Sequence, residues 1–128
     1  MDENRPVTTD RAPRAIGPYS QAIASGGFVF VSGQVALDPG SGQLVRGPLE
    51  EEVARALENM KAVLEAAGSG LERVVKTTVF LTDLKDFEAM NVIYARYFGT
   101  ARPARATVQV VALPRGARFE VDAVARLA

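Results

Sequence analysis

An arginine at the start of an apolar strand is the residue of this chain best suited to chemistry. Arg105 follows Pro103-Ala104 and precedes the alternating segment 106–111. A guanidinium stays charged at any working pH and holds a planar carboxylate through two hydrogen bonds. We therefore expect Arg105 to hold a small anion, although a surface arginine at a strand end is the plainer alternative.

The residue types that are absent limit the chemistry further. The sequence contains neither His nor Cys, which removes disulfides, Cys-based zinc sites and the usual general base. A serine hydrolase centred on Ser32 is disfavoured, because no His is present to activate the hydroxyl. Chemistry must come from arginines, carboxylates, hydroxyls, amides and backbone groups.

One carboxylate and one amide stand in otherwise apolar patterns. Glu120 lies in a segment rich in Phe and Val, so we expect a general acid or base, or a group that orients water, with a pKa raised by partial burial. The alternative is an ion pair with Arg118 or another arginine. Asn91 joins the apolar face of the second predicted helix, where it either fixes a neighbouring loop or contacts a ligand.

Two further positions are candidates for lining a pocket. Tyr19 follows Gly17-Pro18, where a tyrosine either packs with a solvated hydroxyl or lines a pocket mouth. Ser32-Gly33 ends an apolar strand, and the glycine permits a close approach to the backbone. The glycine clusters of the chain match neither a phosphate-binding loop nor a dinucleotide fingerprint, so we interpret them as turns and a helix stop.

Composition indicates one globular domain over 1–128, with residues 1–14 loosely held. The 128 residues are 48% hydrophobic, and 15 Lys and Arg balance 15 Asp and Glu. No basic surplus favours a nucleic-acid partner. No apolar run approaches the roughly 20 residues of a membrane helix, and the N-terminus does not resemble a signal peptide. We expect a soluble, cytoplasmic protein.

Turn residues divide the chain into five strands and two helices. Pro48 is predicted at the first position of a helix that Gly68 ends, and three glutamates follow the proline, as the helix dipole favours. Asp83 caps a second helix that Gly99 ends. Alternation and apolar runs predict strands over 19–24, 28–31, 74–81, 106–111 and 118–125.

This order of elements predicts an α+β fold. Each helix can be a crossover between strands of one mixed sheet, with both helices packed on one face. The segment 28–31 is apolar on both faces, so the other face also needs cover. That face is expected to carry Arg118, Glu120 and Asp122. A second copy of the chain is the simplest cover, so we expect a homo-oligomer.

The ordered segments resemble the RidA family of reactive enamine/imine deaminases, formerly called YjgF, over about residues 12–125. The segments that carry the resemblance are 15–22, 30–34, 56–68, 75–83, Asn91, 103–105 and 112–123. The resemblance implies a chorismate-mutase-like fold, a homotrimer with clefts between subunits, and no metal or organic cofactor. It also implies hydrolysis of 2-aminoacrylate and related carboxylate-bearing imines to 2-oxo acids and ammonia, as in a 2-iminobutanoate/2-iminopropanoate deaminase.

The resemblance also implies roles for individual residues. Arg105 matches the clamp for the substrate carboxylate, and Glu120 matches the group that positions the attacking water. The positions implied in substrate binding are Tyr19, Ser32, Gly33, Asn91 and Thr107. Thr107 stands where some members have Cys, so a backbone role carries over and a thiol role does not. Arg102 and Ala106 also depart from the common pattern, which leaves the substrate range open.

A second class of function fits the same scaffold. The alternative is a non-catalytic protein that binds a small molecule or regulates another process, and some relatives have been linked to RNA cleavage. The neutral net charge argues against a nuclease. The preferred imine, the pathway and the subunit that supplies each site residue are not determined by the sequence.

Overall fold

The computed structural model describes residues 3–128, which form one six-stranded sheet and two α-helices. The strands are β1 (Arg5–Val7), β2 (Ala22–Ser25), β3 (Phe28–Gln34), β4 (Val74–Leu81), β5 (Ala104–Gln109) and β6 (Phe119–Arg126). The α-helices are α1 (Leu49–Ala66) and α2 (Phe87–Phe98), and short 3-10 turns occupy η1 (Leu71–Arg73), η2 (Leu84–Asp86) and η3 (Pro114–Gly116).

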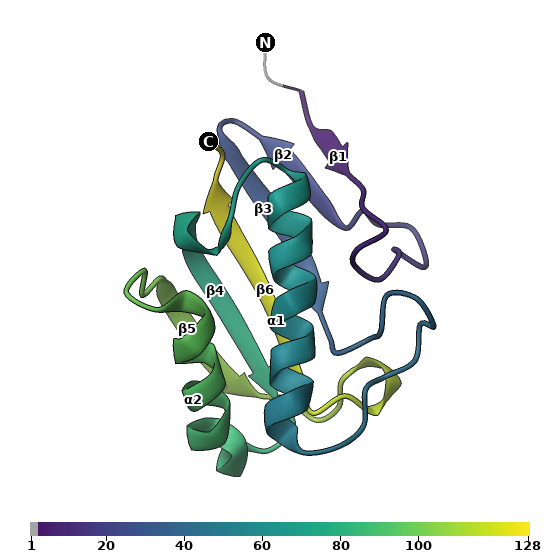
Figure 1. The fold of residues 1–128 in the computed structure, drawn as a ribbon, viewed down its shortest axis with the longest axis vertical. Coiled ribbons are helices and arrows are strands. Elements are labelled where there is room, and N and C mark those ends of the chain that lie inside the picture. The colour runs from purple at the N-terminus through teal and green to yellow at the C-terminus, as the bar shows by residue number, and fades with distance from the viewer. Residues whose placement is uncertain (1–2) are drawn as a thin grey trace.

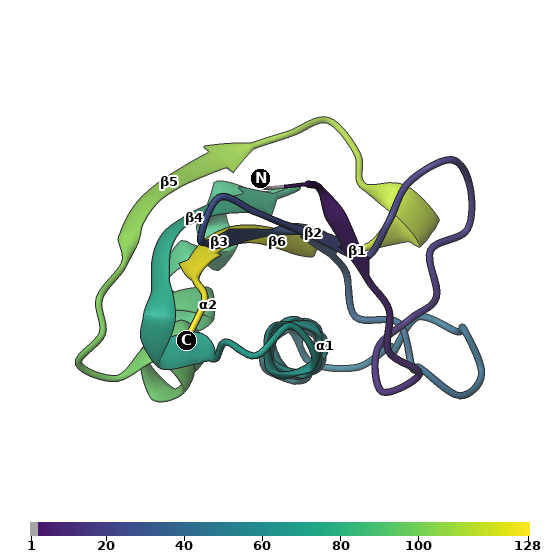
Figure 2. The same ribbon diagram turned by 90° about the horizontal axis from the view of Figure 1, so that it is seen from above.

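The sheet is mixed, in the order β1-β2-β3-β6-β4-β5. Among the strands that the structure describes, β4 and β5 alone pair in parallel, and every other neighbouring pair is antiparallel. α1 connects β3 to β4 and α2 connects β4 to β5, and both helices lie on the same side of the sheet (Figures 1 and 2). The predicted α+β architecture with two helices on one face is confirmed.

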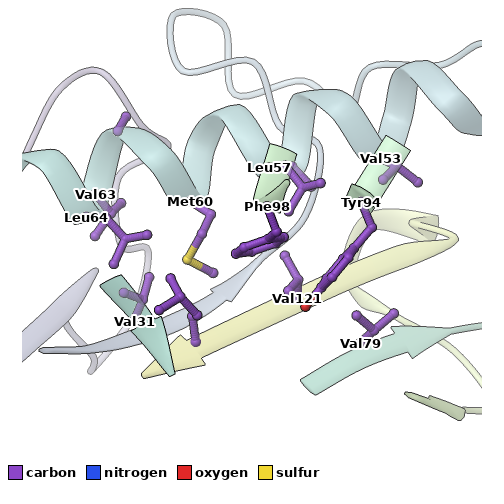
Figure 3. Close-up of a cluster of buried hydrophobic side chains, with 14 of the residues drawn as sticks. Val31, Val53, Leu57, Met60, Val63, Leu64, Val79, Tyr94, Phe98 and Val121 are labelled. Carbon is purple, nitrogen blue, oxygen red and sulfur yellow. The ribbon is translucent and has the colours of Figure 1, made fainter. Parts of the chain in front are cut away.

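The core lies between the two helices and the sheet. α1 contributes Leu57, Met60 and Leu64, and β6 contributes Val121 from below (Figure 3). All four side chains are fully buried. Burial of an aliphatic side chain of this size stabilises a fold by about 1.5–3 kcal/mol. This layer fixes α1 on the sheet and thereby sets where the ends of β3 and β6 lie.

The helix ends follow the predicted signals, with one shift. Pro48 has φ −58° and ψ 148°, so it precedes the helix and is not its first helical residue. Gly68 has φ +83°, a left-handed conformation that glycine adopts without strain, and it terminates the turn after α1. Asp83 caps η2, where its carboxylate accepts a hydrogen bond from the Lys85 amide, and α2 begins after η2.

Residues 3–14 belong to the segment expected to be loosely held, yet several of them make specific contacts. β1 pairs with β2, and Ala12 is fully buried. The buried Gln21 side chain explains the order: it accepts from the Thr9 amide at 2.7 Å and donates to the carbonyls of Thr9 and Pro13 at 3.0 and 2.8 Å. Residues 1 and 2 lie outside the described part of the chain.

Three strand details also differ from simple patterning. Tyr19 precedes β2 and does not belong to it, and Arg105 lies inside β5. In β4 the register shifts between Val74 and Lys76, so Val74 is buried while Val75 is 39% exposed. A bulge changes which side chains face the core, because the two-residue alternation restarts after it.

The face of the sheet opposite the helices keeps apolar side chains at the surface. On β3, Val29 and Val31 are buried under α1, whereas Phe28 and Phe30 are 39% and 47% exposed. Within residues 3–128, no helix has the length and apolar character needed to cross a membrane. In a single chain, segment 28–31 is therefore covered only on the face that packs against α1.

Candidate active site

The predicted site residues fall into two groups within one chain. The first, the arginine cluster, consists of Arg105, Asn91, Phe87, Tyr94 and Thr77. The second, the glutamate cavity, is a hollow of about 570 Å³ whose lining includes Tyr19, Ser32, Gly33 and Glu120. Arg105, Asn91 and Thr107 are not part of this lining.

The arginine cluster lies where β5 packs beside α2. Arg105 Nη1 donates to Asn91 Oδ1 at 2.8 Å. The Arg105 guanidinium carbon lies 4.7 Å from the ring centroid of Tyr94 and 5.5 Å from that of Phe87. Among residues 3–128, Arg105 forms no ion pair. A positioned guanidinium without a carboxylate partner suits the binding of an anion.

Asn91 uses its amide oxygen to orient Arg105. The sequence was compatible with an amide that fixes a neighbouring loop and with an amide that contacts a ligand. In the structure the Asn91 side chain contacts Arg105, the candidate carboxylate clamp. Thr107 follows two residues after Arg105 on β5, so strand alternation puts both side chains on one face. Direct contact of Asn91 or Thr107 with a substrate stays a prediction.

The glutamate cavity forms where β3 is interrupted beside β6. The register between these strands shifts after Val31 and resumes at Gln34, which is a bulge at Ser32-Gly33. The Ser32 hydroxyl donates to the Ser20 carbonyl at 2.6 Å, and its amide donates to the Gln21 carbonyl at 3.0 Å. These bonds hold the bulge in place at the cavity wall.

Gly33 and Glu120 touch across this bulge. A Cβ on Gly33 would overlap the Glu120 carboxylate, so only glycine leaves room for that carboxylate in its present position. From the sequence we expected that some group approaches the backbone closely at Gly33. That group is the side chain of Glu120, the predicted catalytic residue. Gly33 therefore shapes the site through the space that it leaves free.

Burial raises the pKa of the Glu120 carboxyl, and the like charge of Asp122 raises it further. Asp122 lies two residues along β6, so both carboxylates belong to the same face of the sheet. Phe119 and Val121 point into the core, which places Glu120 on the face opposite the helices. A carboxyl with a raised pKa is suited to proton transfer near neutral pH.

The expected neighbourhood of Arg118 is wrong. Arg118 neither shares a face with Glu120 nor pairs with it: its Nε donates to Glu52 Oε1 at 2.8 Å. β6 begins only at Phe119, so strand alternation does not apply to Arg118. Glu52 is 2% exposed and also accepts from the Arg118 and Phe119 amides at 2.6 and 3.2 Å.

Sequence reasoning missed the role of Glu52, which had been interpreted only through the helix dipole. The signal was present, because Glu52 is three residues after Leu49 and four before Ala56, which puts it on the apolar stripe of α1. A carboxylate at such a position requires a buried partner. Glu52 fixes the start of β6 and so the position of Glu120, two residues after Arg118.

Two cations at the glutamate cavity were also missed. Arg14 and Arg115 contribute to its lining. Arg115 has φ +62°, and its Nη1 donates to the Gly42 carbonyl at 3.1 Å. Among residues 3–128, no group of three or more His, Cys, Asp or Glu side chains is arranged to hold a metal ion. Within the described part of the chain, the charged groups that line the cavity are one carboxyl and two guanidinium groups.

Comparison with known proteins identifies the family. A family profile described as "Endoribonuclease L-PSP" matches residues 9–127. The chain belongs to this family. RidA from an Antarctic Psychrobacter species has the same fold, with a TM-score of 0.92, 41% identity and coverage of 96% of this chain and 99% of that chain. The resemblance to the RidA family is therefore confirmed.

Two further members of the RidA family have informative descriptions. The 2-iminobutanoate/2-iminopropanoate deaminase of Homo sapiens is 52% identical over 121 residues, which cover 94% of this chain and 88% of that protein. The structure of E. coli TdcF with bound serine has a TM-score of 0.91 and 38% identity, and covers 97% of this chain and 99% of that chain. Relatives of nearly equal length thus include an imine deaminase and a protein that binds a small amino acid.

Proposed function

We propose that this protein hydrolyses 2-iminobutanoate, 2-iminopropanoate and the related enamine 2-aminoacrylate to 2-oxo acids and ammonia. The observation that carries the proposal is the presence of two functional groups in a chain 52% identical to an imine deaminase. One is the guanidinium of Arg105, held by Asn91. The other is Glu120, whose pKa is raised and whose carboxyl lines the glutamate cavity.

In the proposed mechanism, Arg105 binds the substrate carboxylate through two hydrogen bonds. The enamine tautomerises to the imine, and water attacks the imine carbon. Glu120 orients this water, accepts its proton and passes a proton to the nitrogen. The carbon–nitrogen bond then breaks, ammonia leaves, and the carbonyl of the 2-oxo acid forms. One water is consumed, and no electrons are exchanged with another molecule.

A site that uses both groups requires two copies of the chain. Arg105 faces α2, whereas Glu120 lies on the opposite side of the sheet. Within residues 3–128, Asp122 is the one charged group that shifts the Glu120 pKa, so Arg105 is no close electrostatic neighbour of Glu120. We propose that Arg105 of one copy and Glu120 of another face the same substrate, in the trimer that the family resemblance implies.

The exposed face of the sheet supports this assembly. Phe28 and Phe30 of β3 and the exposed Val108 of β5 offer apolar surface to a neighbouring copy. Large apolar side chains exposed on one face of a soluble protein are typical of interaction surfaces. Association through this face would cover the second face of β3, which a single chain leaves open.

A coupled assay tests the proposed function. A pyridoxal-phosphate lyase that releases 2-aminoacrylate supplies the substrate, and the rate of pyruvate appearance is followed with and without the protein. We expect a protein-dependent acceleration that Arg105→Ala abolishes. Binding of pyruvate without acceleration would instead favour the alternative, a non-catalytic binding protein on the same scaffold. The zero net charge gives no support to the nuclease activity that the family description names.

A further inference from the structure

One face of α2 is built entirely around Arg105. Phe87, Asn91 and Tyr94 are spaced by four and three residues, so they lie on one side of the helix. Each of the three contacts the Arg105 side chain: Asn91 accepts a hydrogen bond from it, and the rings of Phe87 and Tyr94 lie beside its guanidinium. The guanidinium thus has several restraints from one rigid element.

The Tyr94 ring is itself held by a buried hydrogen bond. Its hydroxyl lies 2.7 Å from Thr77 Oγ1, and the exposed fractions of the two residues are 8% and 0%. Figure 3 shows the Tyr94 side chain extending from α2 toward the sheet. Thr77 is β-branched, so its χ1 angle has few alternatives. The far end of the ring therefore cannot swing away from Arg105 without breaking a buried bond.

The strand register links this bond directly to Arg105. Thr77 of β4 is the register partner of Arg105 in the parallel β4–β5 pair. The neighbouring strand position therefore anchors the ring against which the guanidinium rests. Thr77, Tyr94 and Arg105 form a closed loop of contacts through two strands and one helix.

The two kinds of restraint do different work. The Asn91 hydrogen bond fixes one guanidinium nitrogen but leaves rotation about the N···O line free. The Tyr94 ring restricts that rotation, because the guanidinium carbon lies over the ring, 4.7 Å from its centroid. Together they set the plane in which the remaining N–H groups point. A bidentate carboxylate bond depends on that plane.

We propose that Tyr94, locked by Thr77, is a positioning residue that sets the guanidinium plane of Arg105 for carboxylate binding. The inference rests on the proposed function of Arg105 as the carboxylate clamp. Tyr94 does not touch the substrate, and it acts through Arg105. Phenylalanine at position 94 would fill the same space in the core. The hydrogen bond between the Tyr94 and Thr77 hydroxyls therefore serves to orient the ring and not to fill volume.

The first test compares KM with kcat. Tyr94→Leu removes the ring face and is expected to raise KM for the imine about 3- to 30-fold, the range of a cation–π contact, with a smaller change in kcat. Tyr94→Phe and Thr77→Val keep the volume and are expected to raise KM less. Met90→Ala is the control for stability, because Met90 is a buried α2 residue outside the cluster. A KM change in Tyr94→Leu no larger than in Met90→Ala would overturn the proposal.

The second test uses Arg105→Lys as a background. A lysine ammonium has no plane, so it does not need the ring to orient it. We expect Tyr94→Leu to add little to the KM of Arg105→Lys. If Tyr94→Leu raised KM in the Arg105→Lys background as much as it does in the wild type, Tyr94 would act by another route and the proposal would be rejected.

A binding measurement separates this inference from the proposed function. The dissociation constant of pyruvate, a stable carboxylate, is measured by calorimetry for the same variants. If the wild type binds pyruvate without imine turnover, the proposed function fails, and a weaker affinity in Tyr94→Leu still supports the positioning role. If the wild type turns over imine and Tyr94→Leu binds pyruvate equally well, the positioning role alone fails. If the wild type neither binds nor turns over, both fail.

Discussion

The carboxylate of Glu120 occupies the space in which a side chain at Gly33 would begin. A glycine on β3 and a glutamate on β6 therefore share one small volume at the wall of the glutamate cavity. The position of the carboxylate depends on the absence of a methyl group on the facing strand. This dependence makes the pair sensitive to the smallest possible substitution.

We predict that Gly33→Ala displaces the Glu120 carboxylate and lowers kcat by about 10- to 100-fold, because a displacement of about 1 Å has an effect of this size in a positioned site. Gly33 has no positive φ, so the substitution adds no backbone strain. Gly70→Ala is the matched control, because its Cβ would also meet a carboxylate, that of Glu72. Equal activity of the two variants in a steady-state assay would contradict the prediction.

Replacement of Arg105 tests the clamp. Arg105→Ala should lower kcat/KM for 2-aminoacrylate by at least about 100-fold, because two charge-assisted hydrogen bonds are lost. Arg105→Lys should restore part of this loss, since it keeps the charge but not the paired geometry. Arg96→Ala removes an exposed arginine of α2 outside both site groups and should leave kcat/KM unchanged. Unaltered turnover in Arg105→Ala, with circular dichroism showing an intact fold, would exclude a carboxylate clamp at this position.

The pH dependence of activity should report the environment of Glu120. Its pKa is raised above the ordinary value of 4.5, first by burial and then by Asp122. Activity that needs the ionised carboxylate should therefore fall with decreasing pH at a higher pH than for a solvated glutamate. Asp122→Asn removes the like charge, so the acid limb of kcat/KM should move to lower pH.

The Asp122→Asn shift should be partial, because burial, the larger cause, remains. The new side chain keeps the oxygen that accepts from the Thr78 amide at 3.1 Å. If the acid limb of the pH profile of kcat/KM stayed in place or moved to higher pH in Asp122→Asn, the limb would belong to a group other than Glu120.

Glu120 should also reduce stability at neutral pH. A carboxyl whose pKa is raised in the folded state binds its proton more tightly there than in the unfolded chain. The favourable contribution of this protonation to the free energy of unfolding is complete below the pKa of the unfolded chain. It is lost as the pH rises through the pKa of the folded state. Glu120→Gln should therefore raise Tm at pH 7, the advantage should shrink toward pH 4, and activity should be lost. A lower Tm at pH 7 in calorimetric scans would be the opposite result.

Local patterns predict much of the fold correctly. β4 coincides with the predicted strand 74–81, and α1 lies between the predicted signals Pro48 and Gly68. These features depend on residues close in the sequence, such as turn glycines, prolines and the apolar stripe of a helix. The order in which strands alternate with helices then determines the crossovers. The two-helix layer follows from that order with little further information.

The features that were missed depend on contacts between distant segments. Residues 9–13 are held by the side chain of Gln21, and Arg118 is held by Glu52, 66 residues earlier. No local pattern identifies such partners, although a polar residue within an apolar stripe shows that a partner must exist. The roles of the predicted site residues stay predictions, and the residues themselves fall into two groups. Their division into two groups on opposite sides of the sheet was not foreseen, because alternation does not relate an edge strand to a central one.

The separation of Arg105 from Glu120 has a consequence for mixtures of inactive chains. If each active site takes its arginine from one copy and its glutamate from the next, Arg105→Ala and Glu120→Gln damage different halves of the site. Chains of the two variants, unfolded together and reassembled in equal amounts, would form about one intact site in four. Activity would thus arise from two inactive proteins. In such an assembly the unit of catalysis would be the junction between chains.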